Sequence, residues 1–265
     1  MILIKGAGDI ASGVAVRLHH SGFPIVMTDL PHPTSIRRTV CFSEAILKGS
    51  YTVEDVTAEF AENVGFVPAI LARGHIAVLA DPEASCIVKL QPDAVVDAIL
   101  AKKNLGTTIQ DASVVVALGP GFTAGIDCHA VIETMRGHDL GCVILNGTAQ
   151  PNTGIPGNIS GFTTERVLRA PRDGVFMEVC HIGDLVKKGD CVATVDGEPI
   201  CSAIDGVIRG LLPSNTPVHA GMKSGDVDPR GVITNCTTVS DKARAVGGGV
   251  LEAILMLNRR MNHVL

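Results

Sequence analysis

Short apolar runs recur along the first 145 residues, and each is closed by polar or turn-forming residues. They have the length of buried β-strands and are too short to span a bilayer. The runs cover residues 1–5, 24–29, 76–80, 114–118 and 142–145. Apolar residues at helical spacing predict helices over 14–20 and 91–103. This alternation predicts an α/β protein with a Rossmann-like, doubly wound, mostly parallel sheet.

The first apolar run leads into a glycine-rich turn. Gly6, Gly8 and Ala11 form a Gly-x-Gly-x-x-Ala pattern between strand and helix, and Asp29 ends the second strand. Such a turn places backbone amides around a phosphate, and the acid binds a ribose. We therefore predict a nucleotide-binding loop. The alternative is a tight turn that binds nothing, and the carboxylate of Asp9 beside the site counts against an anion. The predicted ligand positions are Gly6, Gly8, Asp9, Ala11, Ser12, Gly13 and Asp29.

A second glycine-rich loop follows the run over 114–118. It lies at the carboxyl end of a predicted strand, where open α/β sheets bind ligands. Glycines there allow a ligand to approach the backbone closely. The predicted ligand positions in this loop are Gly119, Gly121, Phe122 and Gly125.

We expect the second loop to continue into a helix over 127–136. That helix would place His129, Glu133 and Arg136 on one face, where Arg136 binds an anion and the histidine–carboxylate pair transfers protons. The alternative is a solvated helix face with ordinary ion pairs. Weaker catalytic candidates are Cys128 and His138.

Two charged pairs are further candidates. Arg37 and Arg38 follow the second strand and are predicted to contact phosphate, with a solvated basic pair as the alternative. Asp226 and Asp228 offer two carboxylates suited to Mg²⁺, but such a cluster is more often a turn closed by an Asp–Arg pair. No third histidine or cysteine stands at zinc-site spacing.

Residues 169–231 follow a different pattern, with short β-type runs between Asp-Gly and Gly-Asp turns. The sequence around Asp173 returns around Asp205, and the sequence around Val186 returns around Val218, at a constant offset of 32 residues. This repeat predicts a quasi-symmetric β domain that resembles the barrel-sandwich fold of biotinyl and lipoyl carriers. Those carriers hold a modified lysine in a central hairpin, which residues 195–200 lack.

The chain is therefore expected to contain three segments. Residues 1–165 form the α/β domain and residues 166–235 form the inserted β domain. Residues 236–265 form a C-terminal helix that packs back on the α/β domain, because its apolar stretch over 250–257 needs a partner surface.

Composition narrows the class of protein. The net charge of −5 and the lack of a clustered basic stretch give no reason to expect nucleic acid or a membrane as partner. The chain starts directly with a strand, so no secretory signal is expected and a cytoplasmic location is predicted. The 8 cysteines form no Cys-x-x-Cys pair, which favours free thiols. No Gly-x-Ser-x-Gly motif supports a serine hydrolase.

Five stretches together resemble the YqeB family, the accessory proteins of selenium-dependent molybdenum hydroxylases. They cover residues 6–13, 36–45, 118–125, 129–138 and 223–230. The resemblance implies a role in maturing such a hydroxylase, with the apoenzyme or other maturation factors as partners. It assigns no catalytic residue.

Combined with the glycine loops, the resemblance leads to the hypothesis of a phosphate-bearing cofactor at the carboxyl edge of the sheet. The candidates are a molybdopterin-type cofactor and a dinucleotide such as NAD. One rival is an NAD(P)-dependent oxidoreductase with His129 or His138 as proton donor, in which Asp29 favours NAD. The other is a non-enzymatic adaptor that docks the hydroxylase through its β domain. Whether the chain forms a homo-oligomer stays open.

Overall fold

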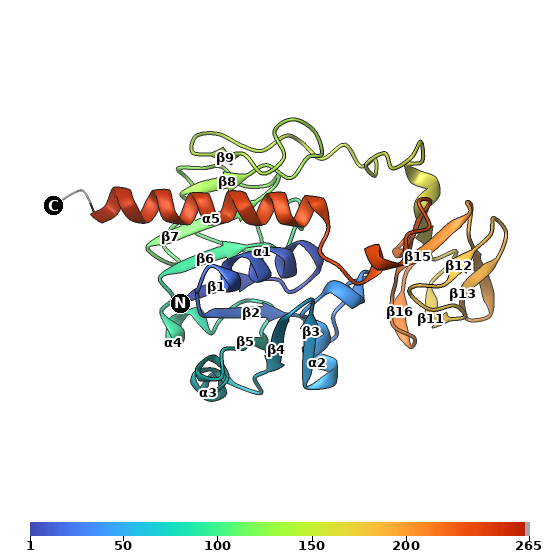
Figure 1. The fold of residues 1–265 in the computed structure, drawn as a ribbon, viewed down its shortest axis with the longest axis horizontal. Helices are drawn as coiled ribbons and strands as arrows, with labels where there is room; N and C mark the ends of the chain where they lie inside the picture. The colour runs from blue at the N-terminus through green and yellow to red at the C-terminus, as the bar shows by residue number, and fades with distance from the viewer. Residues whose placement is uncertain (263–265) are drawn as a thin grey trace. The chain divides into compact units, whose positions relative to one another are not determined.

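The computed structural model describes residues 1–262, which form two compact units (Figure 1). The first unit comprises Met1–Pro33, Cys41–Asn152 and the chain from Val239 to its described end. The second comprises Thr34–Val40 and Thr153–Thr238. Within the described residues, no helix combines the length and apolarity needed to cross a membrane.

The first unit is built on a nine-stranded, mostly parallel sheet with the order β3-β4-β5-β2-β1-β6-β7-β8-β9. The strands are β1 (Ile2–Lys5), β2 (Ile25–Asp29), β3 (Ser50–Val53), β4 (Val56–Phe60), β5 (Ile76–Ala80), β6 (Ala94–Asp97), β7 (Val114–Leu118), β8 (Ala130–Ile132) and β9 (Val143–Ile144). The β3–β4 and β8–β9 pairs at the two ends of the sheet are antiparallel. Strands β2 to β5 lie on one side of β1, and β6 to β9 lie on the other. The strand order therefore reverses between β1 and β6, which is where α/β sheets bind ligands.

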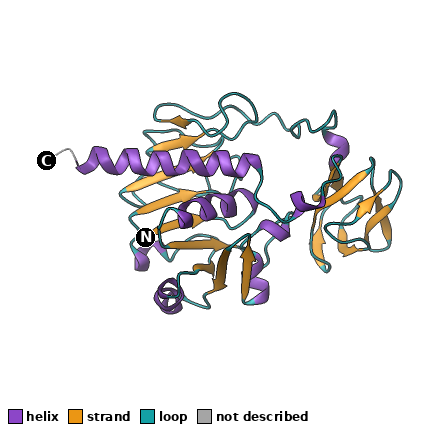
Figure 2. Ribbon diagram, in the orientation of Figure 1, coloured by secondary structure: helices purple, strands orange, loops and turns teal. Residues whose placement is uncertain are grey.

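Two long helices, α1 (Asp9–His20) and α5 (Asp241–Asn262), pack against each other in the first unit (Figure 2). The buried residues of α5 include Ala243, Val246 and Val250, which recur every three to four positions and give the helix one apolar face. Gly13 lets the two backbones approach closely, because a Cβ atom there would lie 2.5 Å from the Cβ of Ala243. The apolar face of α5 is therefore buried within this unit.

Short helices complete the two units. The α-helices are α2 (Glu44–Lys48), α3 (Val67–Ala72) and α4 (Ile87–Leu90). The 3₁₀ helices are η1 (Arg38–Val40), η2 (Val64–Phe66), η3 (Thr164–Arg166) and η4 (Ile233–Cys236).

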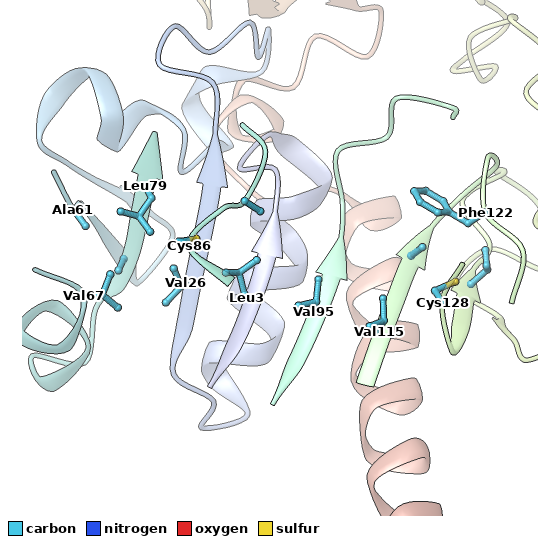
Figure 3. Packing of buried hydrophobic residues seen from close by; sticks show 14 of the residues in the cluster. Leu3, Val26, Ala61, Val67, Leu79, Cys86, Val95, Val115, Phe122 and Cys128 are labelled. Carbon is cyan, nitrogen blue, oxygen red and sulfur yellow. The ribbon is translucent and has the colours of Figure 1, made fainter. Parts of the chain in front are cut away.

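One buried cluster joins the central strands to the segments that cover them (Figure 3). Leu3, Val26 and Val95 belong to β1, β2 and β6, and β7 contributes Val115 and Ala117. They share the cluster with residues of α3 and α4 and of the loops after β5 and β7, namely Val67, Ile70, Cys86, Ile87, Phe122 and Cys128. Burial on both faces explains why these strands read as continuous apolar runs in the sequence.

The second unit contains two four-stranded antiparallel sheets, with the orders β10-β17-β15-β12 and β14-β13-β11-β16. The strands are β10 (Val167–Arg169), β11 (Gly174–Glu178), β12 (Leu185–Val186), β13 (Cys191–Val195), β14 (Glu198–Cys201), β15 (Gly206–Leu211), β16 (Thr216–Val218) and β17 (Lys223–Asp228). Phe176, Val192, Ile208 and Val227 belong to its buried core.

The predicted 32-residue repeat is present in the strand pairing of the second unit. Gly174 pairs with Val218, and Gly206 pairs with Val186, so the same two repeat positions meet in both sheets. Each repeat places its first strand in one sheet and its second strand in the other. The two halves therefore complete each other, and neither has a full sheet alone.

Two predicted helices are wrong. Residues 94–97 form β6 where a helix over 91–103 was expected, and residues 130–132 form β8 where a helix over 127–136 was expected. Both segments carry β-branched residues that are fully buried between neighbouring strands, such as Val95 and Val131. Tertiary burial therefore overrode an apolar spacing that also fits a helix.

Candidate functional site

The glycine turn after β1 lies beside the acid that ends β2. Gly6 has a φ of +95°, and its amide donates to the carbonyl of Thr28 at 2.8 Å. The amide of Ala7 donates to Oδ2 of Asp29 at 2.7 Å. The structure therefore brings the predicted turn and the predicted acid into direct contact. Gly8 caps α1 at its amino end, where helices leave backbone amides without helical partners.

The carboxyl group of Asp29 has an altered acidity. Burial raises its pKa above the usual aspartate value, and the hydrogen bonds from the amides of Leu30 and Ala7 oppose that shift. The Leu30 amide donates to Oδ1 at 2.7 Å. Both oxygens are therefore oriented by backbone donors. The carboxylate keeps lone pairs for the hydroxyl groups of a ligand.

Three predicted ligand positions in α1 have a packing role. The hydroxyl of Ser12 donates to the carbonyl of Ala7 at 3.1 Å and accepts from the amide of Phe42 at 2.8 Å. Ala11 is buried, and Gly13 contacts α5. The side chains of Ala11 and Ser12 and the close approach at Gly13 are therefore used inside the unit, and ligand binding by these residues stays a prediction.

The second glycine loop is shaped mainly by its own neighbours. Gly119 donates to the carbonyl of Ile132 at 2.9 Å, and a Cβ atom at Gly119 would lie 2.6 Å from Oγ1 of Thr134. Gly125 donates to the carbonyl of Cys128 at 2.8 Å, and Phe122 is buried in the core. The amides of Gly119 and Gly125 and the ring of Phe122 therefore have structural roles, and ligand binding by these residues stays a prediction.

Gly121 has a different neighbour. A Cβ atom there would lie 2.6 Å from Cα of Lys103, in the loop after β6. The loops that follow β6 and β7 are thus packed together at the carboxyl edge of the sheet.

The expected histidine–carboxylate pair is not formed. His129 precedes β8 and Glu133 follows it, so the two lie at opposite ends of a strand. Nδ1 of His129 accepts from the amide of Val115 at 3.0 Å, and burial lowers its pKa. Cys128 is fully buried, and burial raises its thiol pKa to about 12. His138 is exposed in the turn after β8. The structure therefore supports neither His129 nor Cys128 as a catalytic group.

Glu133 organises the loop after β8. Its side chain is buried, and Oε1 accepts from the amides of Thr134 and Met135 at 2.7 Å each. Oε2 accepts from the amide of Gln150 at 2.8 Å. Three backbone donors hold this carboxylate, which gives it a positioning role for the carboxyl edge.

A charged cluster surrounds the first turns of α1 and α5. Arg136 forms a bidentate pair with Asp241, with N–O distances of 2.7 and 2.9 Å. The pKa of Lys242 is lowered by burial and by the charge of Arg136, while the carboxylates of Asp9 and Glu133 oppose that shift. Asp9, Glu133 and Arg136 thus form a charged cluster with Lys242. The sequence did not point to Lys242. The only signal in the sequence was an Asp-Lys pair at the predicted start of the last helix.

A second polar group at this edge was also missed. Nζ of Lys5 donates to Oγ1 of Thr107 at 2.6 Å, and that hydroxyl donates to Oδ2 of Asp97 at 2.6 Å. Lys5 ends β1 and Asp97 ends β6, and the two residues are paired in the sheet. All three are buried. The signal in the sequence was a charged residue at the end of an otherwise apolar run.

The predicted phosphate-binding arginines belong to the second unit. Nη2 of Arg37 donates to the carbonyls of Asn235 and Thr238, at 3.1 and 3.3 Å. Arg38 donates to the carbonyl of Leu211 at 2.8 Å and pairs with Glu178. Both guanidinium groups are engaged with groups of their own unit, and phosphate binding by them stays a prediction.

The predicted magnesium carboxylates are paired with arginines. Asp226 pairs with Arg166 at 3.1 Å, and Asp228 pairs with Arg230 at 2.6 Å. Burial pushes the pKa of Asp228 upward, but the bonds from Arg230 and the charge of Arg209 outweigh it and hold that pKa below its usual value. Among the described residues, no group of three or more His, Cys, Asp or Glu side chains could hold a metal ion. The pair of Asp228 with Arg230 has the form that the alternative expected.

No protein-family profile matches the chain. Over 257 residues, 97% of the chain, it is 54% identical to a protein of Escherichia coli K12 named "Uncharacterized protein YqeB". The two are homologues, but the chain covers only 48% of that protein, so it spans about half the length of the curated relative.

Solved structures resemble the chain only weakly. An aspartoacylase family protein of Mesorhizobium loti is 11% identical with a TM-score of 0.28, over 85% of this chain and 84% of that one. The ectoine utilization protein EutE (DoeB) of Ruegeria pomeroyi is 14% identical with a TM-score of 0.24, over 77% and 57%. Likeness at this level carries no argument about fold or function.

Proposed function

We propose that this chain is a maturation factor of a selenium-dependent molybdenum hydroxylase that binds a phosphate-bearing cofactor or nucleotide. The binding site is the carboxyl edge of the nine-stranded sheet. The ligand class follows from the glycine turn, and the hydroxylase context follows from the resemblance of five sequence stretches to the YqeB family. In this proposal the first unit is Rossmann-like, and the second is a barrel-sandwich domain without a carrier lysine.

The observation that carries the ligand class is the contact between the glycine turn and the acid of β2. The amide of Ala7 donates to Asp29 at 2.7 Å, beside the strand at which the sheet order reverses. A turn, a helix start and an acid in this order are what a nucleotide needs: amides for phosphate and a carboxylate for ribose hydroxyls. Gly6, Gly8 and Asp29 are the residues to which the proposal assigns binding. Arg136 and Lys242 supply positive charge nearby, and Asp9 limits how much negative charge the site accepts.

A binding assay tests the proposal. Purified protein is titrated with molybdopterin and with its cytosine dinucleotide, and thermal shifts are recorded in parallel with NAD, NADP and S-adenosylmethionine. Uptake of a molybdopterin compound that weakens about tenfold or more in Asp29→Ala supports the proposal, since each lost hydrogen bond to a charged group is worth roughly that factor. The exposed Asp55→Ala variant is the matched control and should bind normally.

Two outcomes of this assay count against the proposal. Protein that takes up no molybdopterin compound is not a carrier of that cofactor. A thermal shift confined to NAD favours the oxidoreductase alternative, whose proton donor would then need to be found elsewhere than His129. That histidine precedes β8 and uses Nδ1 on the backbone of β7.

The adaptor alternative is supported by the outward face of β11. Val175, Met177 and Val179 alternate along this segment and are 41%, 42% and 55% exposed. Val175 is paired with Pro217, and Met177 is paired with Thr194, so uncharged residues flank the apolar row. Exposed apolar faces of this kind are typical of protein interaction sites. If Val175→Lys/Met177→Lys stops co-purification of the hydroxylase while ligand binding persists, the second unit is an adaptor.

A further inference from the structure

Lys5 is a buried cation with unused hydrogen-bonding capacity. It is 3% exposed, and its ammonium group carries three N–H donors. Among the described residues, Oγ1 of Thr107 is the one acceptor that Nζ reaches, at 2.6 Å. A buried ammonium is costly unless several partners compensate for its lost hydration. The remaining donors of Lys5 therefore point to a group that a ligand supplies.

Thr107 fixes the direction of the hydrogen bonds around Lys5. Its single hydroxyl proton is donated to Oδ2 of Asp97 at 2.6 Å, so its oxygen accepts from Lys5. The other oxygen of Asp97 accepts from the amide of Ile99 at 3.2 Å. Asp97 thus balances the charge of Lys5 through Thr107, and the carboxylate does not occupy the remaining donors of the ammonium group.

Lys5 also lies where a ligand is expected. It ends β1 opposite Asp97 of β6, the pair of strands between which the sheet order reverses. The glycine turn that carries the proposed function begins at the next residue, Gly6. The anion that Lys5 would bind is therefore adjacent to the proposed phosphate site.

The loop over 98–106 begins at Asp97 and returns to Thr107. Leu100 and Lys102 have φ values of 60° and 64°, a left-handed conformation that is unfavourable for residues other than glycine. Strained backbone of this kind clusters at ligand clamps and switch regions.

We infer that Lys5, held by Thr107 and Asp97, is the anchor for an anionic oxygen of the ligand. The oxygen belongs to a phosphate if the ligand is the phosphate-bearing compound of the proposed function, on which this part of the inference rests. A carboxylate offers the same chemistry to an ammonium group, and the experiment separates the two.

The test follows Lys5 directly in the full chain. Protein labelled with ¹³C at lysine Cε is titrated with pyrophosphate and, separately, with citrate, and the Lys5 resonance is assigned by its absence in Lys5→Arg. Calorimetry measures pyrophosphate affinity for the wild type, Lys5→Met and Lys103→Met, the last being an exposed lysine on the same loop. The expected result is a saturable shift of Lys5, a loss of affinity of about tenfold to a hundredfold in Lys5→Met and normal affinity in Lys103→Met.

The other outcomes separate this inference from the proposed function. Pyrophosphate binding that leaves the Lys5 resonance and the Lys5→Met affinity unchanged overturns the inference and leaves the proposed function standing. A Lys5 shift with citrate alone supports the anchor and contradicts a phosphate-bearing ligand. No shift with either anion overturns the inference. If Lys5→Met does not fold, the wild-type resonance decides alone.

Discussion

Each unit buries a carboxylate near a cation, but the two units differ in how many hydrogen-bond partners these charged groups have. In the second unit, Asp228 is fully buried and accepts two hydrogen bonds from the Arg230 side chain and one from its amide, with Nη1 of Arg209 3.5 Å away. In the first unit, Lys5 reaches Asp97 only through the hydroxyl of Thr107. In the second unit, arginine donors satisfy both oxygens of the carboxylate. In the first unit, the ammonium group of Lys5 keeps donors without an acceptor in the part of the chain that the structure describes.

This difference separates a structural charge from a functional one. A buried ion pair persists when hydrogen bonds replace the lost hydration, and removing one partner then strands the other. A buried cation with too few partners stabilises the fold little and is better explained by a ligand. The comparison can be tested, because the two arrangements predict opposite relations between stability and binding.

The largest expected effect is on the second unit. Asp228→Ala leaves the buried Arg209 without its carboxylate, so the free energy of unfolding should fall by about 3–5 kcal/mol. Urea unfolding followed by circular dichroism measures the loss. Asp205→Ala, which removes an exposed pair with Lys187 and a hydrogen bond from the Lys188 amide, is the control and should lower the unfolding free energy much less than Asp228→Ala does.

Acid should reproduce the effect of Asp228→Ala in the wild type. Because the folded-state pKa of Asp228 is lowered, its contribution to stability is present above the unfolded value near 3.9 and is lost as the pH falls through the folded value. The variant should therefore lose less stability in this pH window than the wild type. An equal loss in both would contradict a structural role for this carboxylate.

A smaller effect is expected when the hydrogen bonds that join Lys5, Thr107 and Asp97 in the first unit are removed. Thr107→Val removes the hydroxyl that joins Lys5 to Asp97 and leaves a buried donor and a buried acceptor, at a cost of about 1–3 kcal/mol in unfolding free energy. The urea midpoint at constant slope measures it. Thr108→Val, at an exposed hydroxyl bonded to Asp111, should have little effect.

Lys5→Met should change stability less than Thr107→Val. Lys5→Met removes one hydrogen bond, but it also removes the free-energy cost of burying a charged ammonium group. The unfolding free energy should therefore stay within about 1.5 kcal/mol of the wild type. Pyrophosphate affinity should nevertheless fall. If Lys5→Met binds pyrophosphate normally but is strongly destabilised, Lys5 has a structural role like that of Asp228.

The smallest effect is expected at the rim of the site. Arg136→Ala breaks an exposed pair with Asp241, so the unfolding free energy should change by at most about 1 kcal/mol. The pKa of Lys242 should rise, because the charge of Arg136 helps to lower it. NMR titration of the lysine side chain measures that shift, and an unchanged pKa would show that the two side chains do not interact.

Local patterns were sufficient for several features. The Gly6 turn, the acid of β2 and the buried strands over 76–80 and 114–118 were expected and are present, since they depend on short-range geometry and on apolar runs. The 32-residue repeat also appears in the strand pairing. The turn and the apolar runs are short-range patterns, and the repeat can be recognised by comparing the sequence with itself.

The helix predicted over 127–136 shows where local reasoning ends. Its polar residues fit one helical face, yet β7 on one side and β9 on the other draw this segment into the sheet as β8. His129 and Glu133 consequently lie at opposite ends of a strand. A three-residue strand is decided by its partners, which the spacing of its own side chains does not encode.

By itself, the sequence determined the α/β class, the glycine turn with its acid and the repeat in the second unit, because each follows from periodicity or turn chemistry. Only the tertiary structure decided which buried charged groups have their hydrogen-bond partners within the protein. Asp228 has its arginines, and Lys5, Thr107 and Asp97 meet from positions up to 102 residues apart. Hydrogen-bond satisfaction depends on burial and on distant partners, and neither is written in a local pattern.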